Sequence, residues 1–180
     1  MSYRKMNIYY LLVCIGLLLF HRHVSANTKD HTRVFLDGNI LDTPCSIDPG
    51  SRDQTIRMGA TPVSVIAQDG AGHMVPFTIQ LKDCDLARVN RQLPDWQGVR
   101  VIFNGISDGQ DFLVHGTAKG VALRIFDAKG HVAVPGIPLP SLPLIAGDQA
   151  LSFRMQLVSD RKPIVKGEYH AIIQFGLSYF

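Results

Sequence analysis

The chain has 180 residues, of which 46% are hydrophobic and 18% charged, a balance that fits one globular domain with a core of its own. Its net charge of +3 comes from the first 26 residues, which hold three basic residues and no acidic one, and leave 15 of each sign in the remainder. The sequence therefore gives no electrostatic reason to expect nucleic acid or an anionic surface as a partner.

The N-terminus has the layout of a secretory signal peptide. Arg4 and Lys5 precede an apolar run over residues 8–20, and the small residues Val24, Ser25 and Ala26 follow. A membrane-spanning helix needs roughly 20 apolar residues, so this run is too short to serve as an anchor. We predict a signal peptide over residues 1–26 and export of the rest of the chain.

Beyond residue 26 the hydrophobic pattern has a period near two, and turn pairs such as Pro49-Gly50 and Asp108-Gly109 interrupt it often. Frequent turns between short strands favour an antiparallel β-sandwich. The proline-rich stretch 135–143 is expected to form an extended loop or a sheet edge, and residues 86–93 are the one candidate for a short helix. Strands are predicted at residues 34–41, 55–58, 75–81, 99–103, 112–114, 121–126, 151–158 and 169–180.

Cys45 and Cys84 are the two cysteines left after the signal peptide is removed. In an oxidising compartment such a pair favours one disulfide, which would stabilise the fold by roughly 4 kcal/mol on the chain-entropy model. The alternative is a two-thiol metal or redox site. The wide spacing, without a CxxC motif or clustered histidines, favours the disulfide.

The last predicted strand alternates apolar and polar residues up to the end of the chain. Chain ends usually fray, so an apolar terminal strand needs a partner strand, either within the domain or from another chain. The apolar face consists of Tyr169, Ala171, Ile173, Phe175, Leu177 and Tyr179, and the other face mostly of His170, Gln174, Gly176 and Ser178.

Several motifs together resemble the pilins that the chaperone-usher pathway assembles. The first is VFLDGNIL at residues 34–41, followed by TPCSI at 43–47, and the second cysteine lies in IQLKDC at 79–84. Gly167 is the fourteenth residue from the C-terminus and Tyr179 is the penultimate one, as in that family. The resemblance extends over essentially the whole exported chain.

The resemblance implies an all-β fold, an incomplete immunoglobulin-like sandwich that lacks its seventh strand. In the family a periplasmic chaperone lends a strand to the open groove. At the outer-membrane usher, the N-terminal extension of a neighbouring pilin replaces it by β-augmentation. By this resemblance residues 27–36 form a donor-strand extension, residues 34–180 form the pilin domain, and the product is a fimbrium at the cell surface. The expected chaperone-contact edge comprises Gly167, Tyr169, Ala171, Ile173, Phe175, Leu177, Tyr179 and Phe180.

The expected donor segment departs from that of a rod subunit. Donor strands of the family alternate apolar residues around a glycine, whereas here Thr32 stands at the place of the glycine and only the last two alternate positions are strongly apolar. This weak donor argues against a major shaft subunit and for a low-copy position. The alternate positions are Thr28, Asp30, Thr32, Val34 and Leu36.

Segments 57–63, 99–105, 118–123 and 137–144 resemble the minor subunit that terminates and anchors P pili. The resemblance implies a subunit that is added last and sits at the base of the pilus, with one end of its groove closed. A tip or rod adaptor and a shaft pilin stay open as alternatives.

Enzymatic and sugar-binding functions receive less support. The five histidines after residue 26 are dispersed and form no HExxH motif, the chain has no GxSxG motif, and its glycines form no phosphate cradle. No catalytic residue, metal site or cofactor is therefore predicted. Trp96 is a candidate for sugar stacking in a carbohydrate-binding adhesin, but a lone loop tryptophan more often packs. The histidines are His31, His73, His115, His131 and His170.

Overall fold

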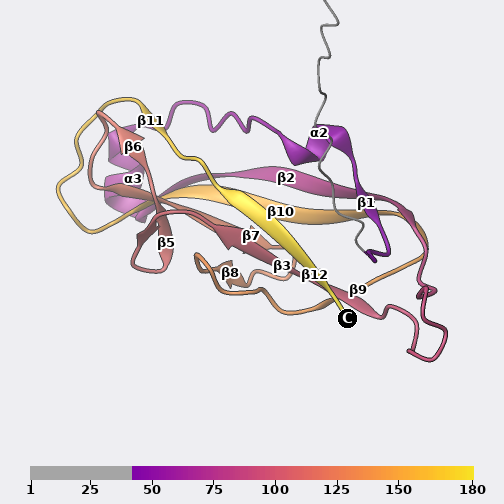
Figure 1. Cartoon of the computed structure of the whole chain (residues 1–180). Helices are drawn as coiled ribbons and strands as arrows, with labels where there is room; N and C mark the ends of the chain where they lie inside the picture. Colours follow the sequence, from indigo (N-terminus) through magenta and orange to yellow (C-terminus); the bar gives the residue numbers. More distant parts are fainter. Residues whose placement is uncertain (1–41) are drawn as a thin grey trace, which may run out of the picture. The chain divides into compact units, whose positions relative to one another are not determined.

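The computed structural model describes residues 42–180, in which strands dominate (Figure 1). The signal peptide, the donor extension at 27–36 and the strand at 34–41 lie outside the described residues and stay predictions. In the described part no helix has the length and hydrophobicity that membrane crossing requires. The elements are β1 (Ser46–Ile47), α2 (Pro49–Arg52), α3 (Val63–Asp69), β2 (Ala71–Cys84), β3 (Gly98–Asn104), β4 (Ser107–Asp108), β5 (Asp111–Leu113), β6 (His115–Gly116), β7 (Val121–Asp127), β8 (Val132–Ala133), β9 (Leu142–Pro143), β10 (Gly147–Ser159), β11 (Tyr169–His170) and β12 (Gln174–Tyr179).

The strands form antiparallel sheets of unequal size. The large sheet has the order β1-β2-β10-β7-β5-β4, with β8 paired to β7, and its long central pair is β2 with β10. A smaller sheet has the order β12-β3-β9, and β11 pairs with β6. Because β12 lies at the end of its sheet, one side of its backbone has no strand partner among the described residues.

The core lies between the large sheet and the small one. Ile79 and Leu81 of β2 and Val99 and Val101 of β3 are all at most 1% exposed, so residues of both sheets are removed from water. The ring of Phe153, on β10, stacks on Phe77 at 5.4 Å and meets Phe103 of β3 edge-on at 5.1 Å. Each fully buried side chain of this size contributes about 1.5–3 kcal/mol, so the facing sheets stabilise each other mainly by apolar burial.

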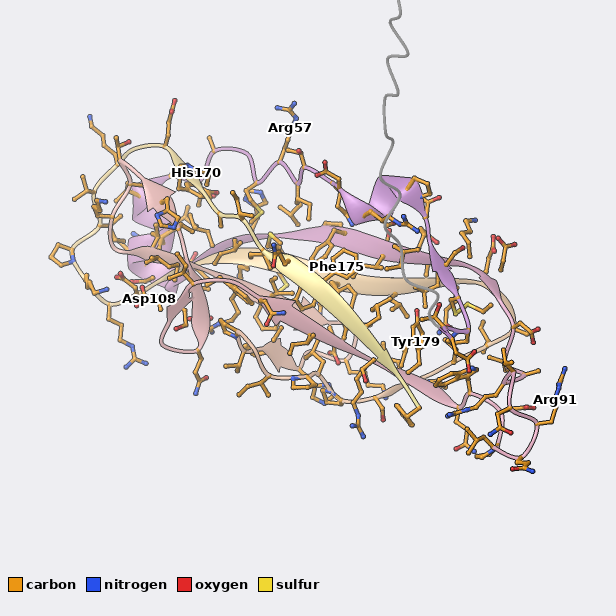
Figure 2. All side chains as sticks on the ribbon, in the orientation of Figure 1. Arg57, Arg91, Asp108, His170, Phe175 and Tyr179 are labelled. Atoms are coloured by element: carbon orange, nitrogen blue, oxygen red, sulfur yellow. A yellow bond between two sulfur atoms is a disulfide. The ribbon has the colours of Figure 1, made fainter. Side chains whose placement is uncertain are left out.

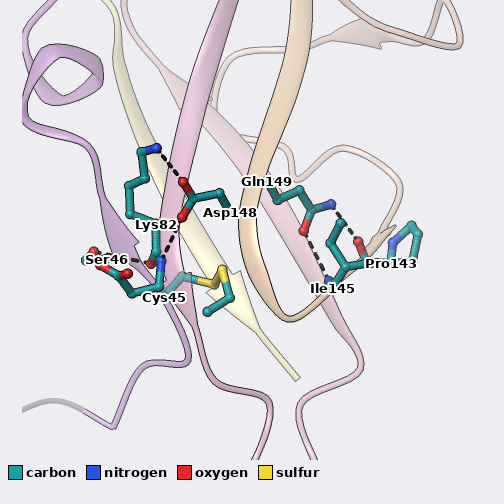
Figure 3. The surroundings of a disulfide bond; sticks show 9 residues. Cys45, Ser46, Lys82, Pro143, Ile145, Asp148 and Gln149 are labelled. Atoms are coloured by element: carbon teal, nitrogen blue, oxygen red, sulfur yellow. Dashed lines mark hydrogen bonds and ion pairs between the residues drawn. A yellow bond between two sulfur atoms is a disulfide. The ribbon is translucent and has the colours of Figure 1, made fainter.

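The disulfide Cys45–Cys84 ties the segment before β1 to the end of β2, with 4.1 Å between the two Cα atoms (Figure 3). Beside it Lys82 forms an ion pair with Asp148, and the backbone N–H of Asp83 donates to the same carboxylate at 3.2 Å. The expected fold class, all-β with one disulfide, is confirmed.

Most predicted strands are present. The strands predicted at 75–81, 99–103, 121–126 and 151–158 lie within β2, β3, β7 and β10, and that predicted at 112–114 overlaps β5. The proline-rich stretch forms a sheet edge, because β9 pairs with β3 and the backbone N–H of Leu139 donates to the carbonyl of Val101 at 2.8 Å.

Three predictions from local pattern are wrong in detail. Residues 55–58 are extended but belong to no sheet, and the strand predicted at 169–180 is broken, because residues 171–173 separate β11 from β12. Residues 86–93 form bends and a turn at 91–92 instead of a helix. Asp85 and Asn90 accept hydrogen bonds from the backbone two residues on, which competes with helical bonding.

A short helix that the sequence did not reveal, α3, follows Pro62. Gly70 ends it in a left-handed conformation with φ of 74°, and its N–H donates to the carbonyl of Ile66 at 2.9 Å. Ile66 is the buried residue of this helix and packs with Ala118, Val121 and Leu157 in a second, smaller core cluster. This cluster supports the end of the fold where β6 and β11 pair.

Candidate functional site: an open groove beside the last strand

A groove of about 890 Å³ lies between residues 51–61 and the segment from Gly167 to Phe175. We call residues 51–61 the first wall, and β11, β12 and the residues joining them the second wall. Val114, Leu123 and Met155 form the apolar floor between them. In Figure 2, Arg57 marks the first wall and Phe175 the second.

One row of side chains on the second wall packs on the core but stays partly exposed to solvent. Phe175 and Leu177 contact the core but are only partly buried, whereas Val101 and Phe103 on the adjacent strand β3 are 1% and 2% exposed. The contrast follows from position, since β3 lies between β12 and β9 while β12 is an edge strand. The alternation predicted for residues 169–179 is present. Its inward row lines the groove as far as Phe175.

The first wall has the side-chain pattern of a strand without its hydrogen bonds. Ile56 and Met58 pack against the core, while Arg57 between them is exposed. The amide group of Gln54 donates to the carbonyl of Thr78 on β2 at 3.1 Å. This side-chain hydrogen bond takes the place of a backbone hydrogen bond between paired strands. The local periodicity therefore predicted correctly that residues 55–58 are extended. It predicted wrongly that they pair with a neighbouring strand.

The atoms around position 167 leave room for a glycine but not for a residue with a Cβ atom. A Cβ atom at this position would lie 2.4 Å from the Thr117 hydroxyl and 2.5 Å from the backbone nitrogen of Ala118. The close approach allows the carbonyl of Glu168 to accept bonds from the N–H groups of Thr117 and Ala118, at 2.9 and 3.0 Å. Gly167 thereby fixes the chain just before β11 and sets the start of the second wall.

Tyrosines stand at both ends of the inward row. The hydroxyls of Tyr169 and Tyr179 are inaccessible to solvent and have no hydrogen-bond partner among the described residues, and burial raises the pKa of each. Tyr179 meets Trp96 edge-on at 6.2 Å, and the guanidinium of Arg88 lies 3.7 Å from the Trp96 ring centre. Trp96 thus packs against the end of β12, which is not the open platform that sugar stacking requires.

The histidines do not assemble a reactive site in the described part of the chain. His115 and His170 face each other across β6 and β11, with their ring centres 5.9 Å apart, but no group of three metal-ligating side chains occurs among residues 42–180. His131 bonds to the buried carboxylate of Asp127 at a turn. What the groove offers instead is an apolar floor between a first wall that belongs to no sheet and a second wall in which one edge of β12 pairs with none of the described strands. This arrangement suits one extended strand.

Comparison with known proteins shows which family the chain belongs to. The model of the fimbrial protein family matches residues 34–179. The chain belongs to this family. The PRS fimbrial minor pilin protein of Escherichia coli is 29% identical over 149 residues, which are 82% of this chain and 76% of that protein.

Two solved structures share the fold of this fimbrial protein. The P pilus rod subunit PapA has a TM-score of 0.68 and 22% identity, with 77% of this chain and all of that one covered. A subunit in the structure of a chaperone-usher pilus has a TM-score of 0.66 and 21% identity, covering 84% and 97%. The protein is thus a structural subunit of a cell-surface fimbrium and not an enzyme.

Proposed function

We propose that this fimbrial subunit is completed by an extended strand from another chain, which lies in the groove between the first and second walls. The observation that carries the proposal is the row from Ala171 to Tyr179, which packs on the core but stays partly exposed beside an edge that pairs with none of the described strands. An inserted strand would bond to the edge of β12 that pairs with none of the described strands, and would place alternate side chains over Phe175 and Ile173. Each apolar side chain buried in this way contributes about 1.5–3 kcal/mol.

A periplasmic chaperone, the outer-membrane usher and a neighbouring pilin are the partners that this mode of assembly requires. An open apolar groove is an aggregation hazard, so the exported subunit needs a transient strand until the permanent one arrives. We assign the transient strand to the chaperone and, in a subunit that is followed by another, the permanent strand to the next subunit, whereas a terminating subunit keeps the chaperone strand. The residues that receive both are those of β12 and the segment that precedes it.

Within the fimbria we assign the chain to the base, where it terminates and anchors the pilus. Two observations support a low-copy position: the similar protein from Escherichia coli is named a minor pilin, and the alternate residues Thr28, Asp30 and Thr32 make a poor apolar donor. The segments that resemble the terminating subunit of P pili favour the base over the tip. An adaptor between tip and rod is the second candidate, since it is also a low-copy subunit.

Strand exchange separates the candidates. The purified complex with the chaperone is mixed with a peptide that copies a rod subunit's N-terminal extension, and chaperone release is followed over time. A terminator is expected to keep its chaperone while a rod-subunit control releases it. Release at the rate of the control would assign the chain to an adaptor or shaft position, and failure to form any chaperone complex would overturn the proposed mode of assembly. Binding of glycans by the stable monomer would favour an adhesin instead.

A further inference from the structure

Two histidines that are far apart in the sequence face each other at one end of the fold. The register pairs His170 of β11 with His115 of β6, and their ring centres lie 5.9 Å apart, with 33° between the ring planes. Directly opposed residues of an antiparallel pair have Cβ atoms about 4.5–5.5 Å apart, so both side chains project from one face. Figure 2 labels His170 at this end, which Figure 1 shows at β6, β11 and α3, opposite to the end that carries β1.

The backbone that carries the two histidines is held by its surroundings. Tyr169 turns inward and packs against the second core cluster, so the neighbouring His170 points outward. Gly116 lets the two strands approach closely, since a Cβ atom there would collide with the carbonyl of Glu168. The same carbonyl accepts a hydrogen bond from the N–H of Thr117 at 2.9 Å. Backbone pairing therefore sets the spacing between the two imidazoles before any ligand binds.

The two rings are exposed and take part in no hydrogen bond or ion pair within residues 42–180. His131 is different, because its ring bonds to the carboxylate of Asp127 at 2.7 Å. A Zn–N bond to histidine is about 2.0–2.1 Å long, which puts the ring centres of two histidines on one ion about 5 Å apart. Small rotations about χ1 and χ2 of two exposed side chains are enough to close the observed 5.9 Å to that distance.

We infer that His115 and His170 bind one divalent transition-metal ion through their imidazole nitrogens. No group of three metal-ligating side chains occurs among the described residues, so water completes the coordination shell. Imidazole suits Cu²⁺, Ni²⁺ and Zn²⁺, and of these Cu²⁺ generally binds most tightly to a given nitrogen site. The inference goes beyond the proposed function and does not depend on which strand fills the groove.

The charges around the pair leave the affinity to the imidazoles. The exposed carboxylate of Glu168 lies two residues before His170 in the sequence. On the other strand, the ammonium of Lys119 donates to the carbonyl of Gly116 at 3.1 Å, next to His115. One negative and one positive charge offset each other, so coordination by the two rings, and not general attraction of cations, selects the ion.

A bound ion would tie together two strands that pair over two residues each. It would act at the end of the fold opposite to the disulfide, which joins the segment before β1 to the end of β2 (Figure 1). An ion that binds the folded chain and not the unfolded one raises the midpoint of thermal unfolding by mass action. The site therefore predicts a stabilising effect of the metal that requires both histidines.

The test uses the exported chain without an affinity tag, purified with its chaperone or with a donor strand fused after Phe180. The probes are Cu²⁺, Ni²⁺ and Zn²⁺ alone, and the chaperone by itself is the blank. Calorimetric titration gives affinity and stoichiometry, and pulsed electron paramagnetic resonance counts the imidazoles on bound Cu²⁺. The variants are His115→Asn and His170→Asn. The matched control combines His31→Asn with His73→Asn and keeps the pair intact.

We expect one Cu²⁺ per chain, with two imidazoles bound to it. Either single variant should bind Cu²⁺ roughly tenfold or more weakly and show one imidazole, because the second ligand no longer acts at high effective concentration. The control should bind like the parent. Since both rings are exposed, His115→Asn and His170→Asn should leave the metal-free unfolding midpoint unchanged and should lose only the rise that the metal causes.

Three outcomes would overturn the inference. A parent chain without saturable binding of any of the three ions would reject the site. Parent-like affinity with two imidazoles in His115→Asn or His170→Asn would place the ion elsewhere on the chain. Loss of binding in the control would assign the ion to His31 or His73 instead of the pair between β6 and β11.

Discussion

Replacing Gly167 by alanine tests how tightly the second wall is held. The added Cβ atom would meet the Thr117 hydroxyl at 2.4 Å and backbone atoms of Thr117 and Ala118 at 2.6 and 2.5 Å. Contacts below 3.0 Å with backbone atoms cannot be relieved by rotating a side chain. The chain before β11 must therefore move away from residues 117 and 118.

The loss in the free energy of unfolding follows from the hydrogen bonds that this movement weakens. Three hydrogen bonds join Glu168 to Thr117 and Ala118, at 2.9, 3.0 and 2.9 Å. At about 0.5–1.5 kcal/mol each, their complete loss would cost about 1.5–4.5 kcal/mol, a range that overlaps the usual cost of overpacking. Because the same residues begin the second wall, strand binding should weaken as well as stability.

Urea denaturation of the subunit with a donor strand fused to its C-terminus measures this cost, since the difference in midpoint at constant slope gives the change in the free energy of unfolding. Gly109→Ala is the control. A Cβ atom added at Gly109 would meet nothing within 4 Å, but the residue has a φ of 65°, so alanine there should cost only the strain of a left-handed residue, about 1 kcal/mol. A Gly167→Ala subunit as stable as the parent would refute the steric reasoning.

Three further predictions concern the disulfide, a buried carboxylate and the last strand. Cys45→Ser should lower the free energy of unfolding by roughly 4 kcal/mol and sharply reduce the exported yield, and unchanged stability would count against a structural disulfide. Burial opposes ionisation of Asp127, but bonds from the ring and backbone of His131 outweigh it and lower its pKa. The stability gained from this carboxylate is present above the unfolded-state pKa and is lost as pH falls through the lowered one. Asp127→Asn should therefore destabilise at pH 7 and have little effect at about pH 2, as urea midpoints at the two pH values would show. Deleting residues 174–180 should abolish co-purification with the chaperone, and normal recovery of the complex would reject β12 as the recognition edge.

Local pattern predicts those parts of the fold whose partners lie within the chain. The strands that became β2, β3, β7 and β10 alternate because one face of each packs on the core, and alternation is visible in sequence. The apolar row of the last strand was visible for the same reason. The expectation of an antiparallel β-sandwich needed no more than this and the pair of cysteines, whereas the expectation of an incomplete immunoglobulin-like sandwich came from the resemblance to pilins.

Local sequence pattern does not predict the structure where a segment lacks a strand to pair with, or where the deciding contact comes from a residue far away in the sequence. Residues 55–58 alternate like a strand, but alternation does not say whether a neighbouring strand exists, and none of the described strands pairs with them. The break at 171–173 arises because β11 pairs with β6 while β12 pairs with β3. The contact between Gly167 and Thr117 joins residues 50 positions apart, so no local signal reveals it.

The exposed charge of Arg57 is another feature that the sequence could not assign. Its identity was evident, but its place on the rim of a groove depends on the extended course of residues 54–60 and on the edge of β12.

The most direct test of the groove is hydrogen exchange at the backbone amides of residues 54–60 and 171–179, with and without a donor strand fused after Phe180. A fused strand that fills the groove should protect amides on both walls and raise the midpoint of unfolding. The same subunit without the strand should exchange rapidly at residues 54–60 and at those β12 amides that do not bond to β3, while the amides of β10 stay protected. Equal protection of the two walls in both proteins would show that the sandwich is already complete and would contradict the account.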